Sequence, residues 1–267
     1  MRFSIIIPSY NSAAFLEETL HSIVTQRADS IEVELIVVDA KSGDGTPQIL
    51  EKYRDSIDIL VVESDTGPAN AINKGLALAT GEIVAWLNAD DVYNPGTLKR
   101  VADIFCTENG VAFGFGKCSI VDEQSTEIRQ GITRFKELFF PLNSRFTYQC
   151  INYISQPATF FSREAYSQAG PLREDMVAAW DYEFFLRLWQ QGHGHCIKGP
   201  PLSSFRWHEQ SISGQNFHLQ FKEELDAAIQ DAGRFSLQTL FHTGVRWGIV
   251  GAYSVMAFLR SKNKNQG

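Results

Sequence analysis

The sequence predicts an α/β fold in which helices flank a mixed and mainly parallel sheet. In the first half, short continuous apolar segments alternate with amphipathic helical segments, a pattern typical of parallel strands that are covered on both faces. Acidic residues follow three of the apolar segments, at Asp39, Asp65 and Asp90. Ligands of such sheets bind beyond the carboxyl ends of the strands. We therefore expect these acids to converge on one site at that edge.

The elements of the first half follow from their apolar periodicity. Strands are expected at residues 3–7, 33–38, 59–62 and 83–87, and helices at 12–26, from 46 onward, at 68–79 and at 94–105. Thr46 is placed to cap the second helix, with Pro47 at its first position. Pro68 opens the third helix and Gly81 closes it.

The second half is less regular. Strands are expected at residues 111–116 and 158–161, and amphipathic helices at 181–191 and 217–229. Residues 122–150 carry few clear signals. The first half is therefore predicted in more detail than the second.

Composition restricts the classes of function. The chain has 267 residues, of which 44% are apolar, as in a globular protein with a substantial core. Its net charge of -7 argues against a nucleic-acid partner, since phosphate contacts need clustered lysine and arginine. The four cysteines form no CxxC pair, and Pro8 ends the short apolar start of the chain. A cytoplasmic protein with reduced thiols and no signal peptide is expected.

The C-terminal segment at residues 240–259 is apolar and about as long as a membrane span, but it contains His242 and Arg246. Basic residues follow it, as they do at a membrane surface. Three interpretations stay open: a packed helix of the globular fold, a helix in a membrane interface, and a true span. Peripheral contact of residues 240–260 with the inner face of a membrane is therefore part of the prediction.

Polar and aromatic side chains end the first two predicted strands. Tyr10 follows the first strand, where its ring can lie against a nucleobase or cover the end of the next helix. Asp39 ends the second strand, and a carboxylate there can accept a hydrogen bond from a base N–H. Gly43 and Gly45 let the backbone approach a ligand closely, although an ordinary turn before a helix explains them as well.

The segment Asn88-Ala89-Asp90-Asp91 joins the fourth strand to the following helix. Mg²⁺ and Mn²⁺ prefer one or two carboxylates together with phosphate oxygens and water. Asp90 fits that role, and Asn88 can support it through water or bind a ribose hydroxyl. A turn before the helix explains the same residues, so the segment alone is compatible with either interpretation.

Two segments of the second half carry further candidates. Asp181 lies at the start of a helix, where the helix dipole favours an ionised carboxylate that can take a proton from a hydroxyl. An ordinary acid at a helix N-terminus is the alternative. The loop at 206–213 contains Trp207, His208 and Ser211. It can close over a diphosphate, although a lone histidine is more often structural.

Taken in order, these segments resemble the family 2 glycosyltransferases of the GT-A fold, which is Rossmann-like. The motifs read IIIPSYN, VVDAKSGDGT, GPANAINKGLALATGEIVAWLNADD, an acid helix at 180–188, and WHEQSIS. One such motif is weak evidence, whereas five in the same order are specific. The resemblance implies a GT-A domain at 1–213, with a nucleotide-binding half at 1–105 and an acceptor half at 106–213, followed by a helical C-terminal extension at 214–267.

Carried over by position, the resemblance implies roles for single residues. Nucleotide contacts are implied for Pro8, Tyr10, Asp39, Asp65, Asn88 and Asp90. Asp181 matches the catalytic base. Asp90 matches a ligand of Mn²⁺ or Mg²⁺, and His208 falls where some members supply a second ligand or a diphosphate contact. Acceptor or closing-loop contacts are implied for Gln156, Trp180, Trp207 and Ser211.

The implied enzyme is an inverting, metal-dependent glycosyltransferase of the hexosyltransferase type, acting in cell-surface polysaccharide or glycolipid assembly. Its donor would be a UDP-, GDP- or dTDP-linked sugar, and its acceptor a saccharide or lipid-linked saccharide. The sequence departs from the family pattern at three positions. Many members have arginine at the position of Ile72 and glutamate at the position of Trp180. The DxD motif begins with an aspartate, whereas this chain has Asn88 there. The alternatives are a catalytically weakened GT-A-like nucleotide-binding protein and a sugar-phosphate nucleotidyltransferase.

Overall fold

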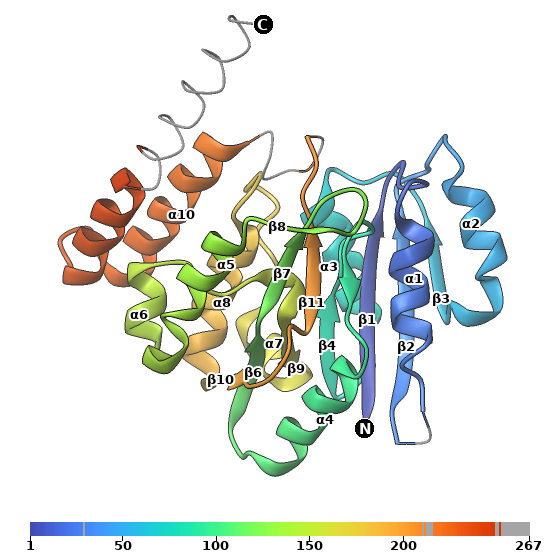
Figure 1. Cartoon of the computed structure of the whole chain (residues 1–267), viewed down its shortest axis with the longest axis horizontal. Coiled ribbons are helices and arrows are strands. Elements are labelled where there is room, and N and C mark those ends of the chain that lie inside the picture. The colour runs from blue at the N-terminus through green and yellow to red at the C-terminus, as the bar shows by residue number, and fades with distance from the viewer. Residues whose placement is uncertain (29, 210, 212–215, 249–250, 252–267) are drawn as a thin grey trace, which may run out of the picture.

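The computed structural model describes residues 1–28, 30–209, 211, 216–248 and 251. Within them, seven strands form one sheet (Figure 1), in the order β10 (His193–Ile197), β6 (Val111–Gly116), β9 (Thr159–Ser162), β4 (Ile83–Trp86), β1 (Arg2–Ser9), β2 (Glu32–Asp39) and β3 (Ile59–Val62). Among these strands, β9 alone runs antiparallel to its neighbours, β4 and β6. The mixed and mainly parallel sheet that the sequence predicts is therefore confirmed.

A second, smaller sheet joins β5 (Val92–Tyr93), β11 (Ser203–Arg206), β7 (Cys118–Val121) and β8 (Glu127–Ile128). The α-helices are α1 (Leu16–Val24), α2 (Thr46–Lys52), α3 (Pro68–Leu78), α4 (Thr97–Thr107), α5 (Gln130–Glu137), α6 (Arg145–Cys150), α7 (Arg163–Ala169), α8 (Trp180–Gln191) and α10 (Phe217–Ala232). Short 3-10 turns lie at Arg54–Ser56, Phe140–Leu142 and Gln156–Ala158. The stretch 122–150, where the sequence gives few signals, thus contains two short helices.

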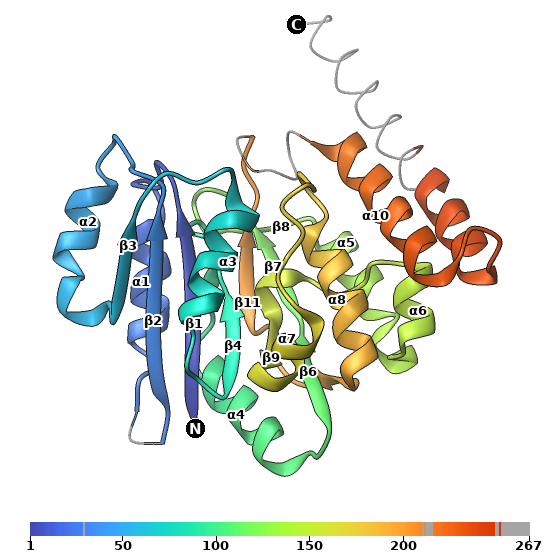
Figure 2. The ribbon, with the colours of Figure 1, turned by 180° about the vertical axis from the view of Figure 1, so that it is seen from behind.

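Helices cover both faces of the large sheet because its strands place alternate residues on opposite sides. On one face, Ile5 of β1 belongs to a buried cluster with Leu20 of α1. On the other face, Ile6 belongs to a cluster with Ile72 of α3 and Phe184 of α8. Figure 2 shows α3, α7 and α8 across this second face. The central strands are buried on both sides, which explains their continuous apolar sequences.

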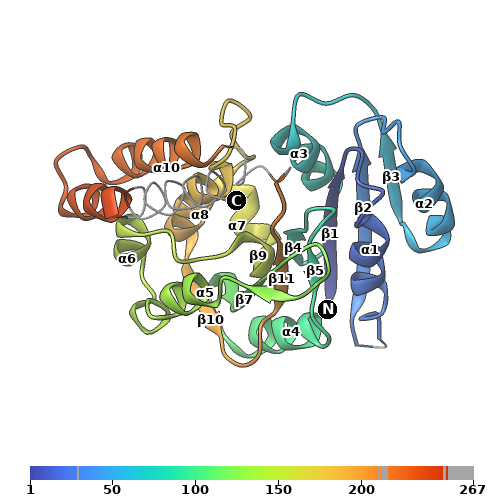
Figure 3. The same ribbon diagram turned by 45° about the horizontal axis from the view of Figure 1, so that its top comes forward.

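The order of the strands reverses at β1. The chain passes from β1 to β2 and β3 on one side, and then returns to β4 on the other side of β1. The carboxyl ends of β1 and β4 therefore flank a topological switch point, where open α/β sheets bind ligands. This edge lies at the top in Figure 1 and comes forward in Figure 3. Residues 8–10 and 88–90 are placed at these two strand ends.

The helices α1 and α4 begin later than predicted, and one predicted cap is wrong. The start of α4 is at Thr97, because Gly96 before it has a positive φ of 76°. Thr46 is the first residue of α2, and Gly45 occupies the cap position. The Thr46 hydroxyl instead accepts a hydrogen bond of 2.8 Å from the backbone N–H of Ser12. It therefore ties α2 to the loop after β1.

The helix α10, from the predicted C-terminal extension, packs against α8 and α6. The Glu223 carboxylate of α10 accepts hydrogen bonds from the backbone N–H groups of residues 177–179, directly before α8. Asp231 forms an ion pair of 2.6 Å with Arg145 of α6. The helix α10 is therefore attached to the part of the chain between residues 106 and 213, and the status of the C-terminal extension as a separate domain stays a prediction.

The predicted membrane-contact segment is described only in part. Residues 237–248 are helical, whereas 249–250 and 252–260 lie outside the described residues. His242 in this helix is buried, and its Nδ1–H donates a hydrogen bond of 3.0 Å to the carbonyl oxygen of Gln149. Across the described part of the chain, no helix combines the length and apolar character that a membrane span requires.

Candidate active site

A cavity of about 1410 Å³ opens at the carboxyl edge of the large sheet. The predicted site residues that line it are Pro8, Tyr10, Asp65, Asn88, Asp90, Gln156, Trp180, Asp181, Trp207, His208 and Ser211. The structure therefore brings together candidates from both halves of the chain. Asp39 is the one predicted site residue that is not part of the lining.

Asp39 lies just behind the cavity wall, with an exposed fraction of 1%. Its two carboxylate oxygens accept hydrogen bonds from the backbone N–H and the hydroxyl of Ser42, at 2.8 and 2.6 Å. The Ser42 hydroxyl also accepts from the backbone N–H of Asn11, and Asn11 in turn accepts from the N–H of Gly43. Asp39 thus fixes the loop that joins the ends of β1 and β2, and its contact with a nucleobase stays a prediction.

The exposed part of this wall carries an aromatic ring. Tyr10 is 65% exposed and lies beside Pro8 in the cavity lining. Asp65 lies across from the β1 end and accepts a hydrogen bond of 3.0 Å from the backbone N–H of Gly67, before α3. A planar ligand can therefore reach the Tyr10 ring without displacing a packed side chain.

The adjacent acids Asp90 and Asp91 have different environments. Asp91 is fully buried and accepts hydrogen bonds from the backbone N–H of Arg206, at 2.9 Å, and the side chain of Asn88, at 3.2 Å. Burial and the neighbouring Asp90 charge hold the pKa of Asp91 well above its usual range. Asp90 instead lines the cavity, with its Oδ2 at 3.0 Å from Nε2 of His208. Of the two acids, Asp90 is therefore the one that a ligand can reach.

Asp90 and His208 form a small set of metal donors. The hydrogen bond with Asp90 raises the pKa of His208. Across the residues that the structure describes, no group of three or more His, Cys, Asp or Glu could hold a metal by itself. A divalent cation with one or two protein ligands takes its other ligands from phosphate and water. The pair therefore fits a cation that binds together with a diphosphate.

Arg206, at the end of β11, fixes the chain beside Asp90. It is fully buried, and its guanidinium donates to the carbonyl oxygens of Asp90 and Asp122, at 3.0 and 2.9 Å. It also forms an ion pair of 2.6 Å with Glu18 of α1. Such charge-assisted contacts are strong and directional. The loop that begins at Trp207 is therefore anchored next to the candidate metal donors.

The loop residues Trp207 and Ser211 also have defined contacts. The guanidinium carbon of Arg129 lies 3.8 Å from the centroid of the Trp207 ring. The Ser211 hydroxyl donates a hydrogen bond of 2.7 Å to the carbonyl oxygen of His208. The first contact joins the loop to the chain before α5, and the second stabilises a turn around His208.

Gln156 and Trp180 form parts of the cavity wall. The side-chain amide of Gln156 donates a hydrogen bond of 2.8 Å to the carbonyl oxygen of Trp86, at the end of β4. Trp180 is only 7% exposed. Both residues therefore shape this part of the cavity wall, and their contacts with an acceptor, including stacking of Trp180 on a sugar ring, stay a prediction.

Asp181 is the second residue of α8, and its carboxylate accepts a hydrogen bond of 2.8 Å from the backbone N–H of Tyr182. Burial raises the pKa of Asp181 above its ordinary value. The helix dipole acts in the opposite direction, and the ionised state expected from the sequence stays a prediction. A raised pKa makes the carboxylate a stronger base.

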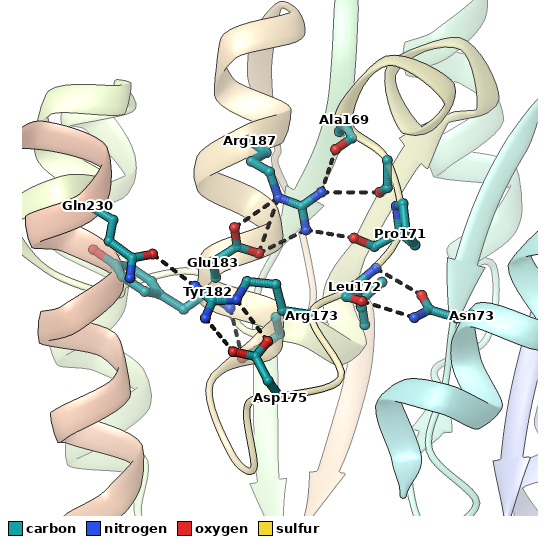
Figure 4. Close-up of polar contacts among 12 residues, drawn as sticks. Asn73, Ala169, Pro171, Leu172, Arg173, Asp175, Tyr182, Glu183, Arg187 and Gln230 are labelled. Carbon is teal, nitrogen blue, oxygen red and sulfur yellow. Dashed lines mark hydrogen bonds and ion pairs between the residues drawn. The ribbon is translucent and has the colours of Figure 1, made fainter. Parts of the chain in front are cut away.

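Polar contacts hold the segment that leads into α8 (Figure 4). Arg187 of α8 pairs with Glu183 at 2.8 Å and donates to the carbonyl oxygen of Pro171 at 2.9 Å. Asn73 of α3 both donates to and accepts from the backbone of Leu172, at 2.9 and 2.8 Å. The start of α8, and with it Asp181, is therefore held in place from α3 and from α8 itself.

The sequence analysis did not identify Glu224, a buried carboxyl group of α10 that also lines the cavity. Its Oε1 accepts hydrogen bonds from the side-chain amides of Asn152, at 3.1 Å, and Gln220, at 3.2 Å. Burial raises the pKa of Glu224 to about 7, and the charge of Asp181 acts in the same direction. A signal was present, because residue 224 falls on the helical stripe of the apolar residues 217, 221 and 228.

Glu224→Gln is expected to change how stability depends on pH. Burial raises the pKa of Glu224 from its ordinary 4.5 to about 7, so the folded state holds the proton more tightly. Wild-type stability therefore falls as the pH rises through this range, and the loss is complete above about pH 7. The glutamine variant cannot titrate and should gain about 3 kcal/mol over wild type at pH 8, but little at pH 4. Denaturant unfolding at both pH values measures the difference.

The matched control is Asp226→Asn, because Asp226 lies on the same helix and is exposed. Its curve should follow that of wild type. Parallel curves for wild type and Glu224→Gln would show that Glu224 does not titrate in this range.

Comparison with known proteins gives one family. The glycosyl transferase family 2 model matches residues 4–170. The poly(ribitol-phosphate) beta-N-acetylglucosaminyltransferase TarS of Staphylococcus aureus is 41% identical over 105 residues, which cover 38% of this chain and 18% of TarS. The putative teichuronic acid biosynthesis glycosyltransferase TuaG of Bacillus subtilis is 35% identical over 128 residues, 47% of this chain and 50% of TuaG. This chain thus matches half or less of each relative's length.

Two solved structures share the fold. TarS residues 1–349 in complex with UDP-GlcNAc superpose with a TM-score of 0.66 at 24% identity, covering 86% of this chain and 67% of that one. The mannosyltransferase PcManGT of Pyrobaculum calidifontis, in complex with GDP-Man and Mn²⁺, gives a TM-score of 0.60 at 20% identity, covering 97% and 79%. The predicted GT-A architecture is confirmed by these similarities.

Proposed function

The chain belongs to glycosyl transferase family 2, and from that premise we propose that it transfers a sugar from a nucleotide sugar to an acceptor hydroxyl in cell-surface polysaccharide assembly. The observation that supports this most is that one cavity has Tyr10, Asp90 and Asp181 together in its lining. It offers a stacking surface, a candidate cation ligand and a base within one space. These are the groups that an inverting displacement at an anomeric carbon needs.

The nucleotide binds at the switch point between β1 and β4. Tyr10 and Pro8 contact the base, and Asp65 and Asn88 contact the rest of the nucleotide. Asp90, with His208, would hold Mn²⁺ or Mg²⁺, and the cation would supply positive charge to the diphosphate. Anchoring of the 207–211 loop by Arg206 keeps His208 beside Asp90. A Mn²⁺ ion in the complex of PcManGT supports the choice of a divalent metal.

The acceptor binds on the side of Asp181, Gln156 and Trp180. Asp181 takes the proton from the attacking hydroxyl, and the oxygen displaces the nucleoside diphosphate from the opposite face of the sugar. The configuration of the anomeric carbon is inverted because the reaction is a single displacement at that carbon. The raised pKa of Asp181 supports this role, since a base works best when its pKa approaches the operating pH.

The relatives suggest which substrates to examine first. The name of TarS specifies an N-acetylglucosaminyl transfer to poly(ribitol phosphate), and its structure holds UDP-GlcNAc. The name of TuaG refers to teichuronic acid biosynthesis. We therefore place UDP-GlcNAc first among UDP-, GDP- and dTDP-linked donors, and polyol-phosphate or saccharide polymers first among acceptors.

A lipid-linked acceptor would bring the protein to a membrane surface. Several apolar side chains are strongly exposed near the C-terminal end of the described chain: Phe235, Leu237, Leu240, Phe241 and Trp247. Basic residues follow in the sequence. These features support peripheral contact at the cytoplasmic face, since exposed apolar and basic groups together bind anionic lipid surfaces.

A thermal-shift screen tests the donor. Nucleotide sugars that bind the folded state should raise the melting temperature, and a concentration of 100 times Kd corresponds to about 2.7 kcal/mol. UDP-GlcNAc, GDP-mannose and dTDP-glucose are compared with Mn²⁺ and with EDTA, and ATP serves as the control. Binding that is equally strong in EDTA would contradict the metal role of Asp90. A lack of binding by every nucleotide sugar would contradict the proposed function.

The two alternatives predict other results. A weakened binding protein would bind a donor without slowly hydrolysing it in the absence of acceptor. A nucleotidyltransferase needs a glycine-rich basic loop after β1, whereas this loop reads Pro8-Ser9-Tyr10-Asn11. The family match also disfavours that alternative.

A further inference from the structure

A second carboxyl group lies at the acceptor end of the cavity, outside the matched family region. The family model ends at residue 170, whereas Glu224 belongs to α10. The helices α8 and α10 pack together, and both Asp181 and Glu224 line the cavity. The charge of Asp181 acts on Glu224, which places the two carboxyl groups within electrostatic reach of each other.

The hydrogen bonds around Glu224 leave one buried acceptor atom, Oδ1 of Asn152, without a donor. Both of its hydrogen bonds, from Asn152 and Gln220, reach Oε1. Within the described part of the chain, Oε2 takes part in neither of them. The Oδ1 atom of Asn152, which also lines the cavity, is buried without a hydrogen-bond partner. Buried acceptors of this kind are normally satisfied, and a ligand with hydroxyl donors would satisfy them.

Glu224 also has no cation in contact among the described ion pairs. A positive charge that acts on it is that of Lys136 of α5, whose Nζ is hydrogen-bonded to the hydroxyl of Ser155 at 3.3 Å. A buried acid without such a partner destabilises the fold. Retention of such a group in a cavity wall is more readily explained by ligand binding than by stability.

We propose that Glu224, together with Asn152, binds a second hydroxyl group of the acceptor, next to the hydroxyl that Asp181 deprotonates. This inference rests on the proposed transferase function. The ligand class is a polyol or sugar ring with neighbouring hydroxyl groups, each able to donate one hydrogen bond. The pair sets acceptor specificity, because an acceptor with a single hydroxyl cannot reach both Asp181 and Glu224.

Kinetics with two acceptors test the proposal. Glu224→Gln keeps the size of the side chain but places an amide donor where Oε2 accepts. With UDP-GlcNAc as donor and ribitol-phosphate oligomers as acceptor, the acceptor KM should rise roughly tenfold, as expected for loss of one charge-assisted hydrogen bond. The effect should be smaller with methanol, which carries one hydroxyl. Asn152→Ala should raise the same KM independently.

The control is Asp226→Asn, which should behave as wild type with both acceptors. Donor binding, measured by thermal shift, shows that each variant is folded. An unchanged acceptor KM in both Glu224→Gln and Asn152→Ala, while wild type transfers normally, would overturn the inference and leave the transferase function intact. Equal losses with ribitol phosphate and methanol would also overturn it. If wild type binds donors but transfers to neither acceptor, the proposed acceptor class is wrong. The inference about Glu224 is then overturned as well.

Discussion

Asp181→Asn is expected to lower the rate of sugar transfer about 10³-fold, because removal of a general base typically costs 10²- to 10⁴-fold. Asparagine has nearly the same shape and can still accept the hydrogen bond from the backbone N–H of Tyr182. The start of α8 should therefore keep its structure. Donor affinity should also be retained, since the role proposed for Asp181 concerns the acceptor. Release of nucleoside diphosphate in the presence of acceptor measures the rate, and calorimetry measures donor binding.

Wild type should also lose activity on the acid side, at a higher pH than an exposed aspartate would impose. Burial raises the pKa of Asp181, so the inactive protonated form appears at higher pH than for an exposed aspartate. Asp175→Asn is the matched control, because Asp175 is exposed and pairs with Arg173 in the loop before α8. Normal turnover by Asp181→Asn would refute the assignment of the base.

Asp90→Ala is expected to remove the effect of divalent metal on nucleoside diphosphate binding and to lower transfer at least about 100-fold, as loss of electrostatic stabilisation of a leaving group does. Asp90 is the accessible member of the acid pair, whereas Asp91 is buried and hydrogen-bonded. His208 would remain but lose its carboxylate partner. Calorimetric titration with UDP, in Mn²⁺ and in EDTA, gives a readout that does not depend on turnover.

The variant should bind UDP equally weakly in both buffers, whereas wild type should bind more tightly in Mn²⁺. Asp103→Asn on α4 is the control, because Asp103 is exposed and interacts with Lys99 of the same helix. A metal effect of wild-type size in Asp90→Ala would place the cation elsewhere. Loss of the protein's melting transition would instead indicate a structural role for Asp90.

The parallel half of the fold was predictable because its signals are local. Strands such as 33–38 are apolar throughout, and a strand of that kind fits only between two covered faces. The strand-end acids Asp65 and Asp90 could be placed at the cavity for the same reason, since parallel strands end at one edge. Family motifs added the second-half residues Asp181 and His208, which no periodicity connects to that edge. The helices between 122 and 150 were missed, because they are short and their sequences are mixed.

The remaining differences between the sequence-based predictions and the structure concern the burial of side chains, which depends on contacts between residues distant in sequence. Asp90 and Asp91 are adjacent and identical in type, and only the packing of β11 shows that Asp91 is enclosed. The place of Asp181 at the start of a helix could be predicted, whereas the burial that raises its pKa depends on distant contacts. Glu224 occupies a position on an apolar stripe, but a single charge there is easily interpreted as an exposed helix residue.

The antiparallel strand β9 has a consequence for synthesis of the protein on the ribosome. The strands β1, β2, β3 and β4 all come from the first part of the chain, and they can pair as soon as β4 has emerged. One edge of β4 then stays open until β9 is made, and the residues of β4 are all buried in the final structure. An open apolar edge strand is a template for pairing with other chains. The nascent protein is therefore most prone to aggregate in the interval between residues 86 and 159, when chaperone binding would be most useful.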